Sequence, residues 1–274
     1  MCRAAAPMTP MRATETWESG DPYEQYVGRW SRRVAPLFVS WLSVPAGRRW
    51  LDIGCGTGAL SASILHQCSP SSVVGVEPSE GFLAKAAELL AGGVRLHRGS
   101  AALIPLEAGS VDVVVSGLVL NFVPDQRAAL AEMVRVTVPG GMIGAYVWDY
   151  AGKMEMMRVF WDAAVELDPE AAKLDEGARF PLCRPDALSD LFTHAGLRDV
   201  AVTALDVPTR FATFDDYWRP FLGGQGPAPA YAVALDEAAR ARLRDRLRDR
   251  LPAQADGSIA LVARAWAVRA TVSS

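Results

Sequence analysis

Five short apolar runs alternate with helix-like segments between residues 48 and 150, and this alternation constrains the fold more than any other feature of the chain. The apolar runs, each of which predicts a strand, cover residues 48–54, 72–78, 94–99, 111–120 and 142–150. The helix-like segments between them cover residues 59–68, 79–91 and 124–137. The runs are almost continuously apolar, which is typical of parallel strands covered on both faces. We therefore predict an α/β fold with an open, doubly wound sheet that binds its ligand at the carboxyl ends of the strands.

The composition of the chain excludes several classes of partner. The formal net charge is −3, so nothing draws the whole molecule to nucleic acid or to an anionic membrane. No run of about 18 apolar residues is present, and the first residues lack the apolar core of a signal peptide. The four cysteines lack the spacing of a disulfide framework or a zinc site; they are Cys2, Cys55, Cys68 and Cys183. We expect a cytoplasmic protein without metal, nucleic-acid or membrane partners.

Glycines stand at every second position directly after the first predicted strand, in the segment LDIGCGTGAL. The spacing of the dinucleotide-binding pattern GxGxxG/A is met by Gly54, Gly56 and Ala59. Glu77 follows about 20 residues later, where a ribose-binding acid belongs. Asp52 disfavours a dinucleotide, because a carboxylate before the turn would repel a pyrophosphate. S-adenosylmethionine instead offers a cationic ammonium and sulfonium, and the third glycine, Gly58, also favours this ligand.

Four motifs in chain order resemble those of the class I S-adenosylmethionine-dependent methyltransferases. They are LDIGCGTG, VVGVEPSEGFLAKA, LEAGSVDVVVSGLVLNFVPD and EMVRVTVPGGMIGAYVW. The resemblance covers roughly residues 48–150. It implies a seven-stranded, mostly parallel Rossmann-like sheet in which an antiparallel last strand, here residues 258–271, lies beside the fifth. Helix-like segments between the late strands also predict helical lid insertions.

The resemblance implies a binding site for S-adenosylmethionine, whose reaction product is S-adenosylhomocysteine. The residues that it assigns to this site are Asp52, Gly54, Cys55, Gly56, Gly58, Glu77, Pro78, Ser100, Ala101, Ser116 and Asn121. In the family, the acid that ends the second strand bonds both ribose hydroxyls, and Glu77 takes this role because a carboxylate can accept two hydrogen bonds from a diol. Asp52 would orient the methionine end of the cofactor.

One position departs from the family pattern. Family members usually carry an aspartate after the glycine that ends the third strand, where it bonds the adenine amine, and this chain has Ser100 there. We therefore expect adenine to be held mainly by the Ala101 amide and by apolar contacts around Pro78 and Leu103.

No sequence signature designates a catalytic base. Methyl transfer is an in-line displacement, so the protein chiefly aligns the reacting atoms, and a base helps only when the acceptor must lose a proton. Asp149 and Tyr150 are weak candidates, because they stand at the end of the fifth strand, at the carboxyl edge of the sheet. The three histidines are interpreted as structural: His66, His97 and His194.

Aromatic residues mark the expected walls of the substrate site. One group lies in an N-terminal helix that would cover the cofactor, one residue stands near the end of the fifth strand, and one group lies in an apolar lid between residues 208 and 235. They are Tyr23, Tyr26, Trp30, Trp148, Tyr217, Trp218 and Phe221. Core packing would explain the lid aromatics nearly as well.

Three other features exclude related activities. The arginine run at residues 240–250 carries Leu243, Leu247 and Leu251 at helical spacing, which indicates an amphipathic helix with a solvated face rather than a nucleic-acid site. DNA amino-methyltransferases usually carry an Asn or Asp with two prolines and an aromatic residue after the fourth strand, and the segment SGLVLNF lacks the prolines of this combination. An acidic cluster for magnesium is also missing.

We predict a single domain over residues 1–274. Its parts are a loose segment 1–18, N-terminal cover helices 19–45, a cofactor-binding core 46–150 and cap insertions 151–196 and 208–252. The expected function is methyl transfer to an O, N or C nucleophile of a small, fairly apolar molecule, by a monomer or a homodimer. The alternatives are a non-catalytic S-adenosylmethionine-binding protein and, less favoured, a dinucleotide-dependent oxidoreductase.

Overall fold

The computed structural model describes residues 24–224 and 226–273. The predicted loose segment 1–18, Cys2 and Tyr23 therefore lie outside the described residues.

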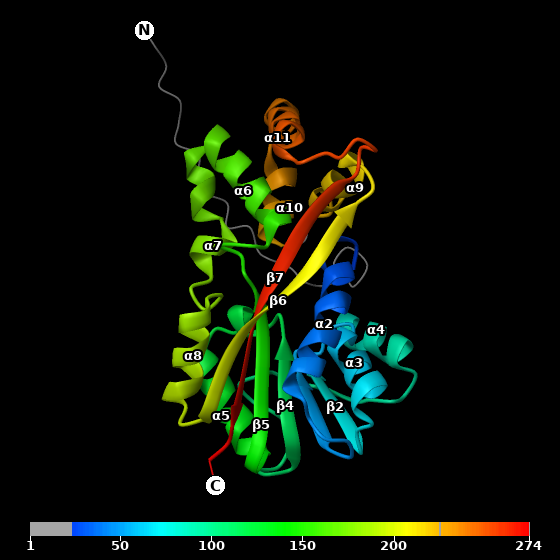
Figure 1. The fold of residues 1–274 in the computed structure, drawn as a ribbon, viewed down its shortest axis with the longest axis vertical. Helices are drawn as coiled ribbons and strands as arrows, with labels where there is room; N and C mark the ends of the chain where they lie inside the picture. The colour runs from blue at the N-terminus through cyan, green and yellow to red at the C-terminus, as the bar shows by residue number, and fades with distance from the viewer. Residues whose placement is uncertain (1–23, 225, 274) are drawn as a thin grey trace.

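A seven-stranded sheet forms the centre of the molecule, with the strand order β3-β2-β1-β4-β5-β7-β6. Its strands are β1 (Arg49–Ile53), β2 (Ser72–Glu77), β3 (Arg95–Arg98), β4 (Val111–Gly117), β5 (Thr137–Trp148), β6 (Arg198–Phe211) and β7 (Ile259–Thr271). Strands β1 to β5 pair in parallel, whereas β7 is antiparallel to both β5 and β6 (Figure 1). This topology confirms the predicted fold class, including the antiparallel last strand beside the fifth.

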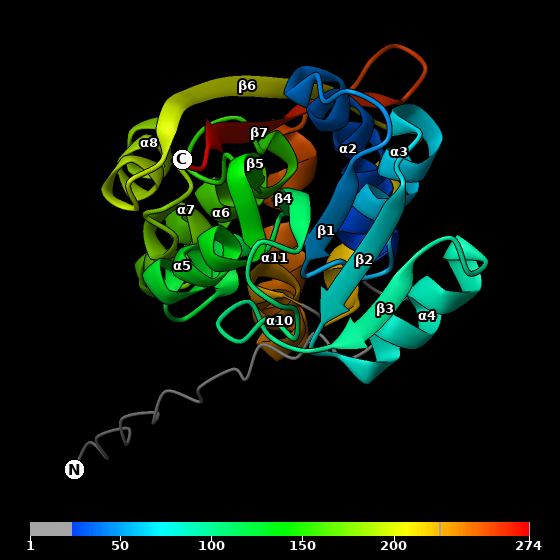
Figure 2. The same ribbon diagram turned by 90° about the horizontal axis from the view of Figure 1, so that it is seen from below.

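Helices cover both faces of the sheet, as the apolar strands require (Figure 2). One face carries α2 (Arg29–Leu42), α3 (Ala59–Cys68) and α4 (Glu80–Leu90). The other face carries α5 (Gln126–Val136) and α8 (Pro185–His194). Two predicted helix starts are confirmed by side-chain caps, since Ser79 accepts a hydrogen bond from the Phe82 amide and Asp125 accepts one from the Ala128 amide.

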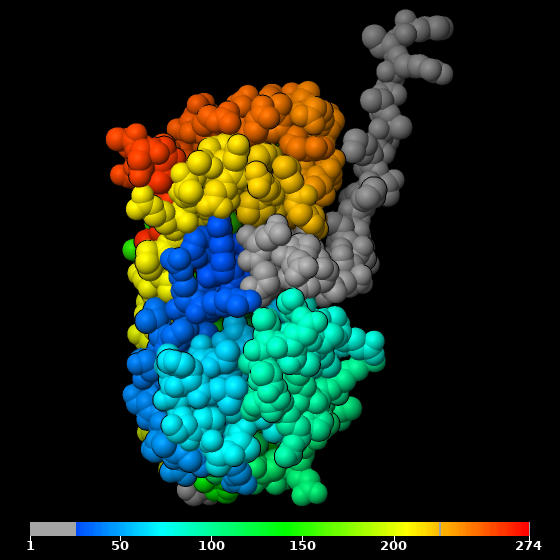
Figure 3. All heavy atoms as spheres, turned by 90° about the vertical axis from the view of Figure 1, so that its right-hand side faces the viewer, coloured from blue at the N-terminus to red at the C-terminus, as the bar shows by residue number. Residues whose placement is uncertain are grey.

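The remaining helices form a cap beyond the carboxyl ends of the strands, in the upper half of Figure 1. They are η1 (Glu24–Gly28), α6 (Glu155–Leu167), η3 (Pro169–Lys173), α7 (Glu176–Arg179), α9 (Phe214–Trp218), η4 (Arg219–Leu222), α10 (Pro227–Ala234) and α11 (Glu237–Arg250). Figure 3 shows α2, in blue, between this cap above and the core below. In α11, Leu243 and Leu247 are buried, which confirms the predicted amphipathic helix.

The long β6–β7 ribbon corrects one predicted boundary. From Ala201 opposite Arg269, its pairing is continuous to Phe211 opposite Ile259, so residues 208–211 belong to a strand rather than to the cap insertion 208–252. The insertion consequently leaves and rejoins the sheet at two directly paired residues.

A second correction concerns the fourth strand, which we predicted to extend to residue 120. The strand ends at Gly117, because Leu118 takes a left-handed conformation with φ 62° and its amide donates to the Tyr146 carbonyl at 2.7 Å. A short 3-10 turn, η2 (Leu120–Phe122), follows. The chain therefore turns away from the sheet at the point where β1 also ends.

Among the described residues, no helix is both long and apolar enough to cross a membrane.

Candidate active site

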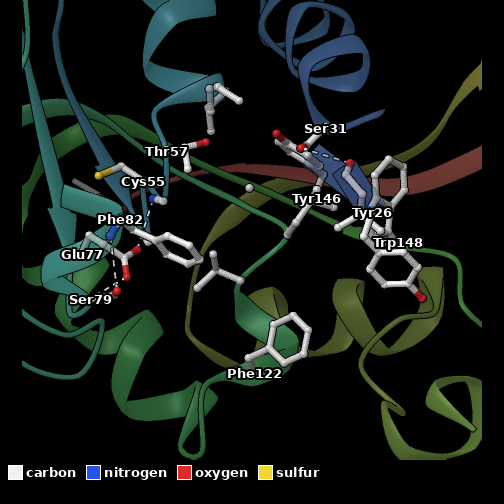
Figure 4. A pocket seen from close by; sticks show the side chains of 18 of the residues that line it. Tyr26, Ser31, Cys55, Thr57, Glu77, Ser79, Phe82, Phe122, Tyr146 and Trp148 are labelled. Carbon is white, nitrogen blue, oxygen red and sulfur yellow. Dashed lines mark hydrogen bonds between the residues drawn. The ribbon is translucent and has the colours of Figure 1, made fainter. Parts of the chain in front are cut away.

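A cavity of about 290 Å³ lies where the carboxyl ends of β1, β2, β4 and β5 meet the cap. In Figure 4, Cys55, Thr57, Glu77, Ser79 and Phe82 lie on one side of it, and Tyr26, Ser31, Tyr146 and Trp148 lie on the opposite side. The first group comes from the turn after β1, from β2 and from the start of α4, and the second comes from η1, α2 and β5. The two sides therefore have separate structural origins.

The turn after β1 needs glycine at Gly54, for two reasons. Gly54 has φ +68°, and a Cβ added there would lie 2.6 Å from both methyl groups of Val119. The Gly54 amide also donates to the Val76 carbonyl at 2.7 Å, which ties the turn to β2. The backbone of the turn is therefore exposed directly to the cavity, without a side chain in between.

Glu77 ends β2 with its carboxylate fixed by backbone amides. Oε2 accepts a hydrogen bond from the Gly56 amide at 3.1 Å, and Oε1 accepts one from the Ser79 amide at 3.0 Å. Burial raises the pKa of Glu77, and the two amides partly oppose this effect. Each carboxylate oxygen keeps a further lone pair for a ligand, so the group can still accept two hydrogen bonds from a diol.

Asp52 is fully buried in the cavity wall at the end of β1. Its Oδ2 accepts a hydrogen bond from the Ser61 hydroxyl at 2.7 Å, whereas Oδ1 has no hydrogen-bond partner among the described residues. Burial raises the pKa of Asp52 to about 7. An unpartnered buried carboxylate oxygen is unfavourable unless a ligand donates to it, so this position fits an ammonium group such as that of S-adenosylmethionine.

The predicted cofactor residues divide into two groups. Those that line the cavity are Asp52, Gly54, Cys55, Gly56, Glu77 and Pro78. Those that do not are Gly58, Ser100, Ala101, Ser116 and Asn121.

The second group has other surroundings in the fold. The Ser116 hydroxyl donates to the Ile53 carbonyl at 3.0 Å and so links β4 to β1. Asn121 is buried in η2, and Ser100 makes an isolated bridge with Leu103 in the turn after β3. Ser79 and Phe82 line the cavity together with Glu77, in place of Ser100 and Ala101. The sequence did not predict these two residues.

The predicted substrate aromatics form two layers. Tyr26 and Trp148 line the cavity itself. The others are buried behind it and do not line it; they are Trp30, Tyr217, Trp218 and Phe221. The Tyr217 hydroxyl donates to the Met156 carbonyl at 2.8 Å, and Phe221 contacts the ring of Tyr26 edge-on at 5.4 Å. The core-packing interpretation of the lid aromatics therefore describes this outer layer.

The two weak candidates for a base lie in different surroundings. Asp149 does not line the cavity, and its Oδ2 accepts a hydrogen bond from the Lys153 amide at 2.9 Å, which closes a turn after β5. Tyr150 does line the cavity and packs against Phe180 at 5.6 Å. Asp149 therefore has a structural contact outside the cavity, whereas Tyr150 is part of the cavity wall.

Glu176 is a cavity residue that the sequence reasoning missed. It begins α7 and is 2% exposed, and its Oε2 accepts a hydrogen bond from the Trp161 indole nitrogen. Burial raises the pKa of Glu176 to about 7. In the sequence it stands in the polar run DEGAR, which resembles a solvated loop, so no local signal could have marked it.

The cavity is otherwise mostly apolar, and three buried carboxylates face it: Asp52, Glu77 and Glu176. A cationic ligand is therefore favoured over an anionic one. In the part of the chain that the structure describes, no group of three or more His, Cys, Asp or Glu side chains is placed to hold a metal ion.

Comparison with known proteins adds to this geometry. A family model described as a methyltransferase domain matches residues 51–144. A demethylmenaquinone methyltransferase from Shouchella clausii (strain KSM-K16) is 32% identical over 181 residues, which are 59% of this chain and 75% of that protein.

Two solved structures are similar in fold. The YcgJ protein from Bacillus subtilis superimposes with a TM-score of 0.56 and 15% identity, over 88% of this chain and 99% of its own. Phosphoethanolamine N-methyltransferase 2 from Haemonchus contortus, solved with phosphomonomethylethanolamine and S-adenosylhomocysteine, gives a TM-score of 0.58 and 15% identity, over 93% of this chain and 58% of its own. At this identity, the two structures establish the shared fold alone.

Proposed function

Because the chain belongs to the class I S-adenosylmethionine-dependent methyltransferases, we propose that it methylates an O, N or C nucleophile of a small, apolar and planar molecule bound under the cap. The observation that carries this proposal is the two-sided cavity. One side offers glycine-turn backbone and carboxylates with free acceptor positions, and the other offers aromatic rings. No observation favours either alternative function considered above.

On the cofactor side, each residue has a proposed role. Glu77 accepts hydrogen bonds from the two ribose hydroxyls while the Gly56 and Ser79 amides hold it in place. Asp52 Oδ1, which has no partner among the described residues, accepts from the ammonium group. Pro78 and Phe82 flank the adenine ring and so replace the contact that the family makes with an aspartate at the position of Ser100.

When bound, S-adenosylmethionine supplies a methyl group on a sulfonium, which makes that carbon already reactive. The task of the chain is to hold the acceptor in line and to exclude water, and such alignment can contribute about 7–11 kcal/mol. The buried outer layer of aromatics behind Tyr26 gives the wall the rigidity that this alignment needs.

On the acceptor side, the aromatic residues Tyr26, Phe122, Trp148 and Tyr150 line the cavity. Rings favour a flat, apolar acceptor, because stacked and edge-on contacts between aromatic groups add about 0.5–1.5 kcal/mol to the burial of their area. The Shouchella clausii relative is named for demethylmenaquinone, a molecule with such a ring system, and this agrees with the proposed acceptor class.

Calorimetry on the purified full chain tests the proposal. We expect S-adenosylmethionine and S-adenosylhomocysteine to bind with micromolar dissociation constants and NAD to bind at least a hundredfold more weakly. Binding of NAD alone, or of none of the three, would refute the proposed cofactor. Release of S-adenosylhomocysteine with a panel of aromatic acceptors tests turnover, and no release on any of them would count against the acceptor class.

A further inference from the structure

Glu176 lies on the acceptor side of the cavity and has no role in the function proposed so far. It reaches the cavity from α7, and Tyr26 of η1 and Tyr150 after β5 line the same cavity. The Tyr26 hydroxyl is buried and has no hydrogen-bond partner among the described residues. Burial is the main effect that raises the pKa of Tyr26, and the nearby negative charge of Glu176 adds to it. Two polar groups with free hydrogen-bonding positions therefore face the same part of an otherwise aromatic wall.

The segment that carries Glu176 is held rigidly. The Arg158 guanidinium donates to both carboxylate oxygens of Asp175, at 2.9 and 2.7 Å, and to the Tyr150 carbonyl at 3.1 Å. Asp175 in turn accepts a hydrogen bond from the Gly177 amide at 2.8 Å. The residues on both sides of Glu176 are thus fixed to α6 and to the end of β5.

A buried carboxylate in this position needs a reason. Removing it from water is unfavourable, and the indole of Trp161 occupies only one of the several acceptor positions of the group. A neutral side chain could bond this indole equally well. The charged groups around Glu176 are Asp175 and Arg179 of its own segment, Arg158 of α6 and the ionisable hydroxyl of Tyr26.

We infer that Glu176 is the catalytic base and that the acceptor is an uncharged aromatic hydroxyl compound, a phenol. This inference rests on the proposed function. The acceptor ring lies among Tyr26, Trp148 and Tyr150, and its hydroxyl donates to the Glu176 carboxylate.

The proton balance of the step is simple. The acceptor O–H bond breaks and its proton passes to the Glu176 carboxylate. The acceptor oxygen uses an electron pair to form the new bond to the methyl carbon. The carbon–sulfur bond breaks, and its electron pair stays on sulfur. The negative charge of Glu176 and the positive charge of the cofactor disappear together. A poorly hydrated cavity favours such mutual neutralisation, because charges are expensive there.

The pKa of Glu176 favours a phenol over other hydroxyl and amine acceptors. Burial raises its pKa to about 7, and a phenol has a pKa of about 10, as for tyrosine, so the two groups can exchange a proton readily. An aliphatic alcohol is far less acidic. An aliphatic ammonium group would bring a second positive charge next to the cofactor.

The experiment compares the full chain with Glu176→Gln, which keeps an acceptor for Trp161 and cannot take a proton. The matched control is Glu155→Gln, because Glu155 bonds the Val262 amide outside the cavity. The probes are 2-naphthol and its methyl ether, titrated calorimetrically without cofactor at pH 6 and pH 8. S-adenosylhomocysteine is titrated into the same samples to show that each variant is folded.

For the full chain and for Glu155→Gln, we expect 2-naphthol to bind at least tenfold more tightly than its ether at pH 8, with a smaller preference at pH 6. In Glu176→Gln the preference falls below threefold at both pH values, and with S-adenosylmethionine present the methylation of 2-naphthol slows about 10²–10⁴-fold. The inference would be overturned by any of these results: an unchanged preference in Glu176→Gln, a full chain that shows no preference or does not bind 2-naphthol, or equal rates of 2-naphthol methylation in the full chain and Glu176→Gln. Failure of S-adenosylhomocysteine to bind the full chain would refute the proposed function instead.

Discussion

Replacement of Glu77 by alanine is the sharpest test of the cofactor side of the cavity. In the proposed complex, the carboxylate accepts two hydrogen bonds from the ribose, and hydrogen bonds to charged groups contribute about 1.5–3 kcal/mol each. Part of this loss of binding free energy is offset, because the variant no longer buries a carboxylate whose pKa is already raised by burial. We therefore expect a net loss of about 2–4 kcal/mol, which corresponds to an increase of about 30- to 1,000-fold in the dissociation constant of S-adenosylhomocysteine.

The assay is calorimetric titration of S-adenosylhomocysteine into the full chain, Glu77→Ala and a control. The control is Glu80→Ala, because Glu80 lies three residues further on, and its exposed salt bridge with Arg98 contributes little. Glu80→Ala should bind within twofold of the full chain. A dissociation constant for Glu77→Ala within threefold of the full chain, with the fold intact, would refute the role of this carboxylate.

Three further predictions concern stability and cofactor binding. The pKa of Asp52 is about 7 in the folded chain and about 3.9 in an unfolded one, so the folded state holds the proton more tightly, and stability is lost as the pH rises through this window. Asp52→Asn should remove up to about 4 kcal/mol of this loss. In urea titrations, its free energy of unfolding should therefore depend less on pH between pH 4 and pH 8 than that of the full chain. The same pH dependence in both proteins would contradict the prediction. Leu247→Ala in α11 should lower the free energy of unfolding by about 2–5 kcal/mol, whereas the exposed Arg242→Ala should change it little. Gly54→Ala should abolish S-adenosylhomocysteine binding because its Cβ meets Val119, whereas Gly109→Ala, with a similar φ of +61° and open space around its Cβ, should suffer only the backbone strain and keep binding.

The core of the fold could be predicted from the sequence because its signals are local. The apolar runs and the residues Ser79 and Asp125 determine strands and helix starts through contacts within a few positions, and the structure places them accordingly. The glycine turn is predictable for the same reason, since strand, turn and helix are consecutive in the chain.

The cap and the acceptor side were less predictable, because their contacts join distant parts of the chain. Glu176 owes its burial to Trp161 and to the pairing of Arg158 with Asp175, and none of these contacts has a local pattern. The aromatics Tyr217 and Phe221 could equally line a site or pack behind it, and only the path of the chain after β6 decides between these positions.

The direct pairing of Phe211 with Ile259 at the tip of the β6–β7 ribbon has a consequence for how this scaffold can diversify. Everything between these two residues enters and leaves through neighbouring positions on adjacent strands, so its length and sequence can change without moving either strand. The insertion is in effect an exchangeable cassette that supports the wall behind Tyr26, while the glycine turn and Glu77 follow β1 and end β2, in the other half of the sheet from β6 and β7. A new acceptor could therefore be accommodated by grafting a different cassette, with no compensating change around Glu77.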